Sequence, residues 1–161
     1  MKHDKNIELT KHDLVMLVDD SAIDNFVSQK TMVNNNFAEN VLEFLSARTA
    51  LDYLLEQGLT GNESAIPSLI CLDMNMPVMN GFGFMEEFEK LPEMVREKSH
   101  VVILTSMYNP EILSLTFKNS NIINFISKPL IRLNLETIEL TLRKKQENRL
   151  MNDLSLEILV Q

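Results

Sequence analysis

Polar side chains that could act together follow four separate apolar runs of the sequence, at the point where each run ends. They are Asp19 and Asp20, Asp73, Thr105 and Lys128. If the runs are parallel strands, their carboxyl ends meet at one edge of a sheet, which is where ligands bind in α/β proteins. Three carboxylates placed close together repel one another unless a divalent cation or a lysine ammonium lies between them. The pattern therefore predicts a site for Mg²⁺, which prefers hard oxygen ligands and few carboxylates.

A site of this composition has the groups that phosphoryl transfer needs. A carboxylate can attack phosphorus and form an acyl phosphate, and the transfer is helped by neutralising charge on the phosphoryl oxygens. Asp73 would be the nucleophile, and Mg²⁺ held by Asp20 and Asp73 would neutralise one oxygen. Lys128 would neutralise a second oxygen, and the Thr105 hydroxyl would bind a third. The backbone carbonyl of Asn75, two residues after Asp73, could be a further metal ligand.

Each of these residues also has an ordinary structural explanation when it is taken alone. Asp19 and Asp20 could cap a helix, as Asp often does. Thr105 could be a simple hydroxyl at a strand end, and Lys128 could belong to a turn because it precedes a proline. Their common position at the ends of apolar runs favours the joint interpretation.

The apolar runs alternate with stretches of helical period, which predicts an α/β fold with a doubly wound parallel sheet and helices on both faces. Five strands are expected, at residues 14–18, 41–45, 68–72, 101–104 and 122–126. Helices are expected after Ser21 and Ser46 as caps, from Gly81 to about Leu91, from Pro110, and from about Leu133 onwards. Gly58 is expected to end the second helix, and residues 92–99 to form a connection. The predicted inward residues are Ile23, Phe26, Val27 and Met32 or Val33, then Ala50, Leu51, Leu54 and Leu55, then Met85 and Phe88.

The composition argues against several classes of protein. With 161 residues, of which 45% are hydrophobic and 24% charged, the chain has the size and composition of one globular domain. The net charge of −8 argues against a surface for non-specific nucleic-acid binding. No apolar run approaches the roughly 20 residues of a membrane span, and the first residues lack the apolar core of a signal peptide, so a cytoplasmic protein is expected. Cys71, the single cysteine, is expected to pack as a small apolar side chain rather than to act as a nucleophile.

Four short motifs resemble the receiver domain of two-component response regulators. They are VDD at residues 18–20, LDMNMPVMNG at 72–81, ILTS at 103–106 and SKP at 127–129, and the likeness runs from about Leu14 to Lys144. The resemblance implies a flavodoxin-like sheet with strand order 2-1-3-4-5 and a bound Mg²⁺. It also implies that Asp73 is the phosphoacceptor, that Asp19 and Asp20 are the acidic metal pair with the Asn75 carbonyl, that Lys128 binds phosphate, and that Thr105 and Phe125 are the switch residues.

The resemblance further implies a function in signalling rather than turnover. A histidine kinase or a histidine phosphotransfer protein would donate the phosphoryl group to Asp73, and the phosphorylated domain would bind a protein target. Residues 1–12 are expected to form an arm, 13–145 the receiver domain and 146–161 an extension, which leaves no room for an output domain and suggests a stand-alone regulator like those of chemotaxis. Two other functions remain open: a Mg²⁺-dependent phosphatase or hydrolase with Asp73 as nucleophile, and a scaffold that works without phosphate. The apolar Met107 implies slow loss of the phosphoryl group, because it cannot orient a water molecule.

The last residues allow two structures. As a helix, they place Leu150, Met151, Leu154 and Ile158 on one stripe, which could pair with a partner or a second copy of the chain. As a strand, apolar residues from Leu154 to Val160 would alternate with the residues between them. The helix is favoured, and with it a homodimer through the C-terminal segment.

Overall fold

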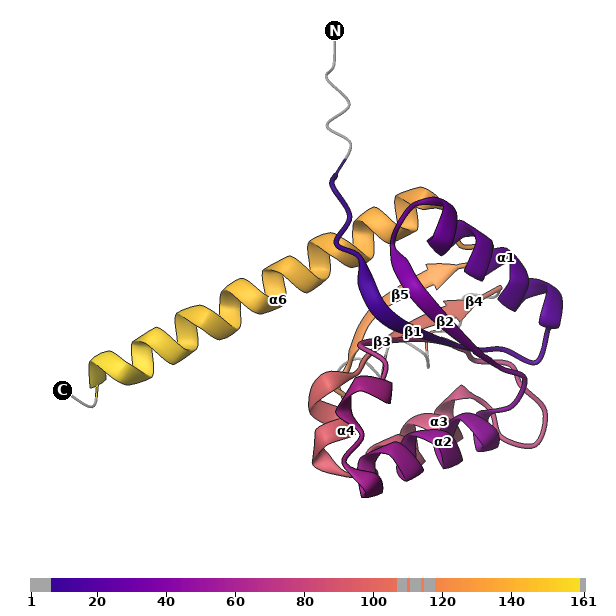
Figure 1. Ribbon diagram of the computed structural model, residues 1–161, viewed down its shortest axis with the longest axis horizontal. Helices are drawn as coiled ribbons and strands as arrows, with labels where there is room; N and C mark the ends of the chain where they lie inside the picture. Colours follow the sequence, from indigo (N-terminus) through magenta and orange to yellow (C-terminus); the bar gives the residue numbers. More distant parts are fainter. Residues whose placement is uncertain (1–6, 107–109, 111–113, 115–117, 160–161) are drawn as a thin grey trace, which may run out of the picture.

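Five parallel strands form the centre of the protein. The computed structural model describes residues 7–106, 110, 114 and 118–159. The strands are β1 (His12–Val18), β2 (Ala38–Phe44), β3 (Leu69–Asp73), β4 (His100–Thr105) and β5 (Ile122–Ser127), in the spatial order β2-β1-β3-β4-β5 (Figure 1). The predicted strands are therefore confirmed within three residues at each end, as is the order that the resemblance implied.

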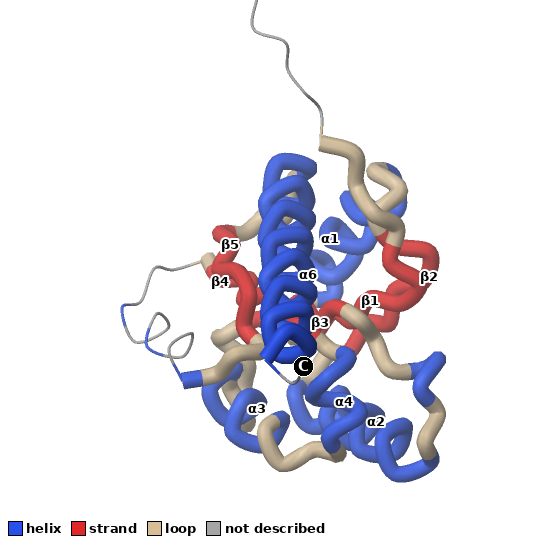
Figure 2. Tube along the Cα trace, turned by 90° about the vertical axis from the view of Figure 1, so that its left-hand side faces the viewer, coloured by secondary structure: helices blue, strands red, loops and turns tan. Residues whose placement is uncertain are grey.

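Helices cover both faces of the sheet. α1 (Ala22–Asn34) and α6 (Arg132–Leu159) pack on one face, whereas α2 (Ala47–Thr60), α3 (Gly81–Phe88) and α4 (Glu93–Lys98) pack on the other (Figures 1 and 2). A short 3₁₀ turn, Glu63–Ala65, precedes β3. Each face has its own apolar core, because successive side chains of a strand point to opposite faces. In β1, for example, Met16 and Val18 belong to the core under α2 and α3, whereas Val15 and Leu17 belong to the core under α1 and α6.

The first two helices begin at the predicted capping residues, but the second helix does not end at the predicted glycine. Ser21 and Ser46 cap α1 and α2 as predicted, since each side chain accepts a hydrogen bond from a backbone N–H of the first turn. Gly58 does not end α2; the helix continues to Thr60, and Gly61 ends it in the left-handed conformation with φ 68°. Gly58 has a packing role instead, because a Cβ there would lie 2.8 Å from Pro92 Cγ and from Val95 Cγ2.

The inward face of α1 differs from the prediction. Asn25, Ser28 and Met32 are buried. Of the apolar residues predicted to face inward, Met32 is buried as expected, but Ile23, Phe26, Val27 and the alternative Val33 are exposed. Leu55 of α2 is also exposed, whereas the other predicted inward residues of α2 and α3 are buried. The first turns of α1 pack over the polar ends of the strands, so that polar side chains point inward there and apolar ones remain in solvent.

Three more segments can be compared with the structures predicted for them. Residues 92–99 were expected to be a connection, but they contain the short helix α4, whose buried Val95 fills space beside α2. Pro110 is helical, as expected, and so are Ser114 and Lys118, whereas Met107 lies outside the described residues. α6 confirms the helical interpretation of the C-terminal segment, and its second half extends beyond the rest of the molecule (Figure 1).

Candidate functional site

Three carboxylates meet at the carboxyl edge of the sheet. Asp19 and Asp20 follow β1, and Asp73 ends β3, which pairs directly with β1. One oxygen from each of the three lies within 4.8 Å of the others. Asp19 and Asp73 are buried, whereas Asp20 is exposed. Carboxylate oxygens at this spacing, with one side open to solvent, fit a Mg²⁺ ion that keeps part of its water shell.

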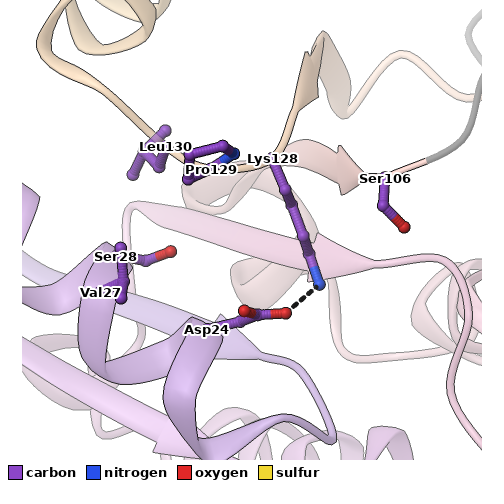
Figure 3. A pocket seen from close by; sticks show the side chains of 7 residues that line it. All are labelled: Asp24, Val27, Ser28, Ser106, Lys128, Pro129 and Leu130. Carbon is purple, nitrogen blue, oxygen red and sulfur yellow. Dashed lines mark hydrogen bonds and ion pairs between the residues drawn. The ribbon is translucent and has the colours of Figure 1, made fainter.

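Lys128 supplies positive charge to the same place. It follows β5, and its Nζ lies 2.5 Å from Asp19 Oδ2 and 3.1 Å from Asp73 Oδ1. A third carboxylate, that of Asp24 in α1, lies 3.1 Å from the same Nζ (Figure 3). Burial lowers the pKa of the Lys128 ammonium, but hydrogen bonds and charge from Asp19 and Asp73 outweigh it, so that the pKa is raised above its ordinary value. The lysine is therefore a permanent cation at the site.

At Asp19, unlike at Lys128, the effect of burial on the pKa outweighs the effect of the hydrogen bonds. Burial raises the pKa of the Asp19 carboxyl above its ordinary value, and the charge of Asp73 adds to this effect. Hydrogen bonds from Lys128 and from the Ser21 N–H oppose the rise in part. A divalent cation would relieve the remaining repulsion between Asp19 and Asp73, which is the electrostatic reason that the site suits a metal.

The turn between β1 and α1 is braced by Asn25, a residue that the sequence interpretation missed. The Ser21 N–H donates to Asp19 Oδ1 at 2.9 Å. The Asn25 side-chain amide donates to the Asp19 carbonyl at 3.1 Å and to the Phe44 carbonyl at 3.4 Å, which ties the ends of β1 and β2 together. Ser21, Asn25 and Ser28 follow a helical spacing, so a search for polar residues on one helix face would have found this buried side.

The loop from β3 to α3 is shaped around Asp73. The Asn75 N–H donates to Asp73 Oδ2 at 3.1 Å, and the Gly81 N–H donates to the Met74 carbonyl at 3.1 Å. A side chain at Gly81 would lie 3.0 Å from Met74 Cα and closer still to its sulfur, so this approach requires glycine. Val78, at the tip of the loop, has a φ of 68°, which is strained for a β-branched residue. The loop thus presents Asp73 with a fixed orientation.

Thr105 and Phe125 lie on neighbouring strands near the site. Thr105 ends β4, is nearly buried, and its carbonyl accepts the Lys128 N–H at 3.0 Å. Phe125 pairs with Ile103 in the sheet and packs, half-buried, against the core under α2 and α3. The structure therefore brings Asp19, Asp20, Asp73, Thr105 and Lys128 to one edge, with Phe125 behind it.

A cavity of about 260 Å³ opens beside the carboxylates. Its walls come from α1, from the end of β4 and from the segment after β5, and it is lined by Asp24, Val27, Ser28, Ser106, Lys128, Pro129 and Leu130 (Figure 3). One end of the cavity is charged and the rest is largely apolar. A group that reacts with Asp73 could therefore approach past Lys128.

A comparison with protein families identifies the domain. The family model for the response regulator receiver domain matches residues 15–138. The chain belongs to this family. The receiver domain is a signalling domain, and the match covers most of β1, the four other strands and the start of α6.

Individual relatives agree with this assignment. The chain is 29% identical over 98 residues to response regulator Rcp1 of Synechocystis sp., a match that spans 61% of this chain and 65%, less than two thirds, of that protein. A crystal structure of a two-component response regulator from Cytophaga hutchinsonii has a TM-score of 0.70 and 29% identity, over 81% of this chain and 98% of that one. The phosphorylated cyanobacterial phytochrome response regulator RcpA has a TM-score of 0.61 and 26% identity, over 79% and 88% of the two chains.

The buried thiol and the helices add two further findings. Burial raises the pKa of the Cys71 thiol to about 12, so that the thiol is not a nucleophile at neutral pH, as the sequence predicted.

Across the described residues, every helix is too short or too polar to cross a membrane.

Proposed function

We propose that Asp73 accepts a phosphoryl group in a Mg²⁺-dependent reaction and that the phosphorylated receiver domain signals by binding another protein. The observation that carries this proposal is the grouping of Asp19, Asp20 and Asp73 within 4.8 Å, with the Lys128 ammonium 3.1 Å from Asp73. A site of three carboxylates and one lysine at a sheet edge suits transfer of a phosphoryl group onto a carboxylate. The phosphorylated relative RcpA supports the same chemistry.

Each residue has a distinct task in the proposed reaction. An oxygen of Asp73 attacks phosphorus, while the Asn75 N–H holds the other oxygen and fixes the carboxylate plane. Lys128 neutralises charge on one phosphoryl oxygen, and the Thr105 hydroxyl donates to another. Asp19, Asp20, Asp73 and the Asn75 carbonyl would hold Mg²⁺, which would supply further positive charge at the phosphoryl oxygens.

The exposed apolar surface of α1 supports a protein as phosphodonor. Ile23 and Phe26 of α1 are 75% and 55% exposed, and Ile131 and Leu133, after β5, are also exposed. Val27 of the same helix and Leu130 line the cavity that leads to Lys128. An exposed apolar patch beside a reactive carboxylate suits a docking protein. We propose a histidine kinase or a histidine phosphotransfer protein as this partner.

The proposed signal depends on Thr105 and Phe125. When Thr105 donates to a phosphoryl oxygen, the end of β4 is drawn toward the site, and the neighbouring Phe125 can repack. Phosphorylation would then shift an equilibrium between two arrangements of a surface that includes β5 and α6.

We also propose a division of the chain into an arm at residues 1–12, a receiver domain at 13–145 and an extension at 146–161. The arm is tied to α6, because Thr10 donates to both carboxylate oxygens of Glu139, and Arg143 donates to the Glu8 carbonyl. The extension continues as a helix with exposed Leu150 and Met151, which supports a homodimer through α6.

Phosphorylation of Asp73 can be tested by intact mass spectrometry after incubation with acetyl phosphate. We expect wild-type protein to gain the mass of one phosphoryl group when Mg²⁺ is present and to gain none in excess EDTA. Asp73→Asn keeps the size of the side chain but removes the nucleophilic oxygen, so this variant should gain no mass. A matched control is Asp52→Asn, which removes an exposed carboxylate of α2 that pairs with Arg48, and it should behave like wild type.

Two results would contradict the proposal. Wild-type protein that gains no mass from acetyl phosphate or from a panel of phosphorylated histidine proteins would favour the scaffold function. Continuous hydrolysis of a chromogenic phosphate ester, abolished by Asp73→Asn, would instead favour the phosphatase function.

A further inference from the structure

Lys128 has an acidic neighbour that the phosphoryl-transfer site itself does not require. Its Nζ lies close to three carboxylates: 2.5 Å from Asp19, 3.1 Å from Asp73 and 3.1 Å from Asp24. Figure 3 shows the Asp24 contact, which joins α1 to the segment after β5 across the cavity. An ammonium has three N–H donors, so these carboxylates can use all of them. A phosphoryl oxygen that binds Lys128 must then replace one of the three.

The exposure of the three carboxylates indicates which one is replaced. The side chains of Asp19 and Asp73 are 6% and 5% exposed, whereas that of Asp24 is 46% exposed. A buried carboxylate that loses its counter-charge is strongly destabilised, which applies to Asp19 throughout and to Asp73 for as long as it is still a free carboxylate. An exposed carboxylate is rehydrated at small cost, because exposed ion pairs contribute little. Asp24 is therefore the contact that Lys128 can lose most easily.

The position of Asp24 is fixed by the first turn of α1. The Asp24 N–H donates to the capping Ser21 Oγ at 3.2 Å, and the next residue, Asn25, is anchored to the Asp19 carbonyl. A negative charge in the first turn is also favourable with respect to the helix dipole. The Asp24 carboxylate is thus held at a defined place relative to Asp19, on the side of Lys128 that faces the cavity.

We propose that Asp24 is a positioning residue that holds Lys128 in the unphosphorylated protein and releases it when Asp73 is phosphorylated. The inference rests on the proposed function. In the transfer, an Asp73 oxygen forms a bond to phosphorus, the bond from phosphorus to the leaving group of the donor breaks, and the leaving group departs with the electron pair. The Lys128 ammonium then donates to a phosphoryl oxygen in place of Asp24, whose carboxylate becomes hydrated.

The test is the ratio of the phosphorylation rate to the hydrolysis rate in Asp24→Asn. Intact mass spectrometry gives the first rate during incubation with acetyl phosphate and Mg²⁺, and the second after removal of the donor. Asp24→Asn removes a contact that only the unphosphorylated state makes, so the ratio should rise about two- to fivefold. Asp24→Glu, which keeps the charge and the ability to pair with Lys128, should bring the ratio back toward the wild-type value.

The same substitution in a Lys128→Gln protein separates the effect of the Asp24–Lys128 contact from a general effect of the Asp24 charge. In Lys128→Gln, Asp24 has no ammonium to hold, so adding Asp24→Asn should leave the ratio unchanged. A change of the same size in both backgrounds would overturn the inference, and so would an unchanged or lower ratio in Asp24→Asn alone.

A spectroscopic measurement reports the contact without any phosphoryl transfer. In metal-free protein, the ¹⁵Nζ resonance of Lys128 should shift in Asp24→Asn and should remain unchanged in Asp52→Asn, which removes an exposed carboxylate paired with Arg48. An unshifted Lys128 resonance in Asp24→Asn would overturn the inference. Wild-type protein that gains no phosphoryl group would refute the proposed function instead, and the lysine resonance would still decide whether Asp24 holds Lys128.

Discussion

At the scale of single residues, two histidines lie at the edge of the sheet opposite the carboxylates. His12 begins β1 and His100 begins β4. His12 Nδ1 lies 2.8 Å from Ser68 Oγ, but within the described part of the chain His12 Nε2 and His100 Nδ1 have no hydrogen-bond partner. Burial lowers the pKa of both imidazoles, and positive charge, chiefly that of Lys145, helps to lower that of His100 to about 4. Both histidines are therefore neutral in the folded protein at neutral pH.

We expect His100→Gln to weaken the dependence of stability on pH. In wild type, His100 becomes protonated near pH 6.5 in the unfolded chain but only near pH 4 in the folded protein. Between these values the unfolded state binds more protons, so the free energy of unfolding falls as the pH falls. The contribution of His100 to this loss is about 1–3 kcal/mol, and glutamine cannot be protonated. Urea unfolding at about pH 7 and about pH 4.5 measures the loss, and an equal loss in both proteins would contradict the prediction.

At the scale of elements, the contact between α2 and α4 is set by a glycine. We expect Gly58→Ala to lower the free energy of unfolding, although alanine is the better helix former by about 1 kcal/mol. The new methyl group would lie 2.8 Å from atoms of Pro92 and Val95, neither of which can move far. Overpacking of this kind costs about 1–3 kcal/mol, so the net effect should be a loss of about 1 kcal/mol, within a range of about 0–2 kcal/mol.

The control for this substitution is Gly83→Ala in α3. A Cβ at Gly83 meets only the flexible side chain of Met79, at 3.1 Å, and the Asn80 side chain at 3.8 Å. We therefore expect Gly83→Ala to leave stability unchanged or slightly higher. Urea unfolding of both variants tests the pair, and a Gly58→Ala protein as stable as wild type would show that α4 can shift away from α2.

The strands were predictable because their signal is local. β3 and β4 read as continuous apolar runs, since both faces of a central strand are buried. β2 lies at the edge of the sheet and carries more exposed residues, so its start at Ala38 was missed by three residues. Asp19, Asp73 and Lys128 could be placed at one edge for the same reason, because each follows a strand.

The errors concern features that depend on packing between elements. Phe26 and Val27 looked like core residues, yet α1 directs Asn25 inward because its first turns lie over the polar ends of β1 and β2. The sequence predicts a helix end at Gly58, whereas the role of this residue depends on α4, a helix in a stretch predicted to be a connection. The contact of Asp24 with Lys128 joins residues 104 positions apart, and spacing in the sequence gives no sign of it.

At the scale of the whole molecule, α6 is longer than the sheet that it covers. Its first half packs through buried Leu135, Ile138 and Leu142, and its buried Glu139 holds Thr10 of the arm and pairs with Arg143. Residues 146–153, by contrast, are all exposed. A helical segment that buries little of its surface is marginally stable in water. The extension therefore favours a packing partner, and a second copy of α6 would provide one.

We expect the full chain to form a dimer and a chain without residues 150–161 to be a monomer. Leu150 and Met151 are 63% and 66% exposed, which makes them the apolar residues of the extension most available for contact. Light scattering coupled to size-exclusion chromatography, over a range of protein concentrations, measures the mass of each chain. The full-length double variant Leu150→Glu with Met151→Glu controls for the loss of length, and it should also be a monomer. Phosphorylation by acetyl phosphate should be unchanged in both, because neither change reaches Asp73. A truncated chain that keeps the mass of a dimer would place the interface elsewhere on the domain, and a full chain with the mass of a monomer would show that α6 does not pair with itself.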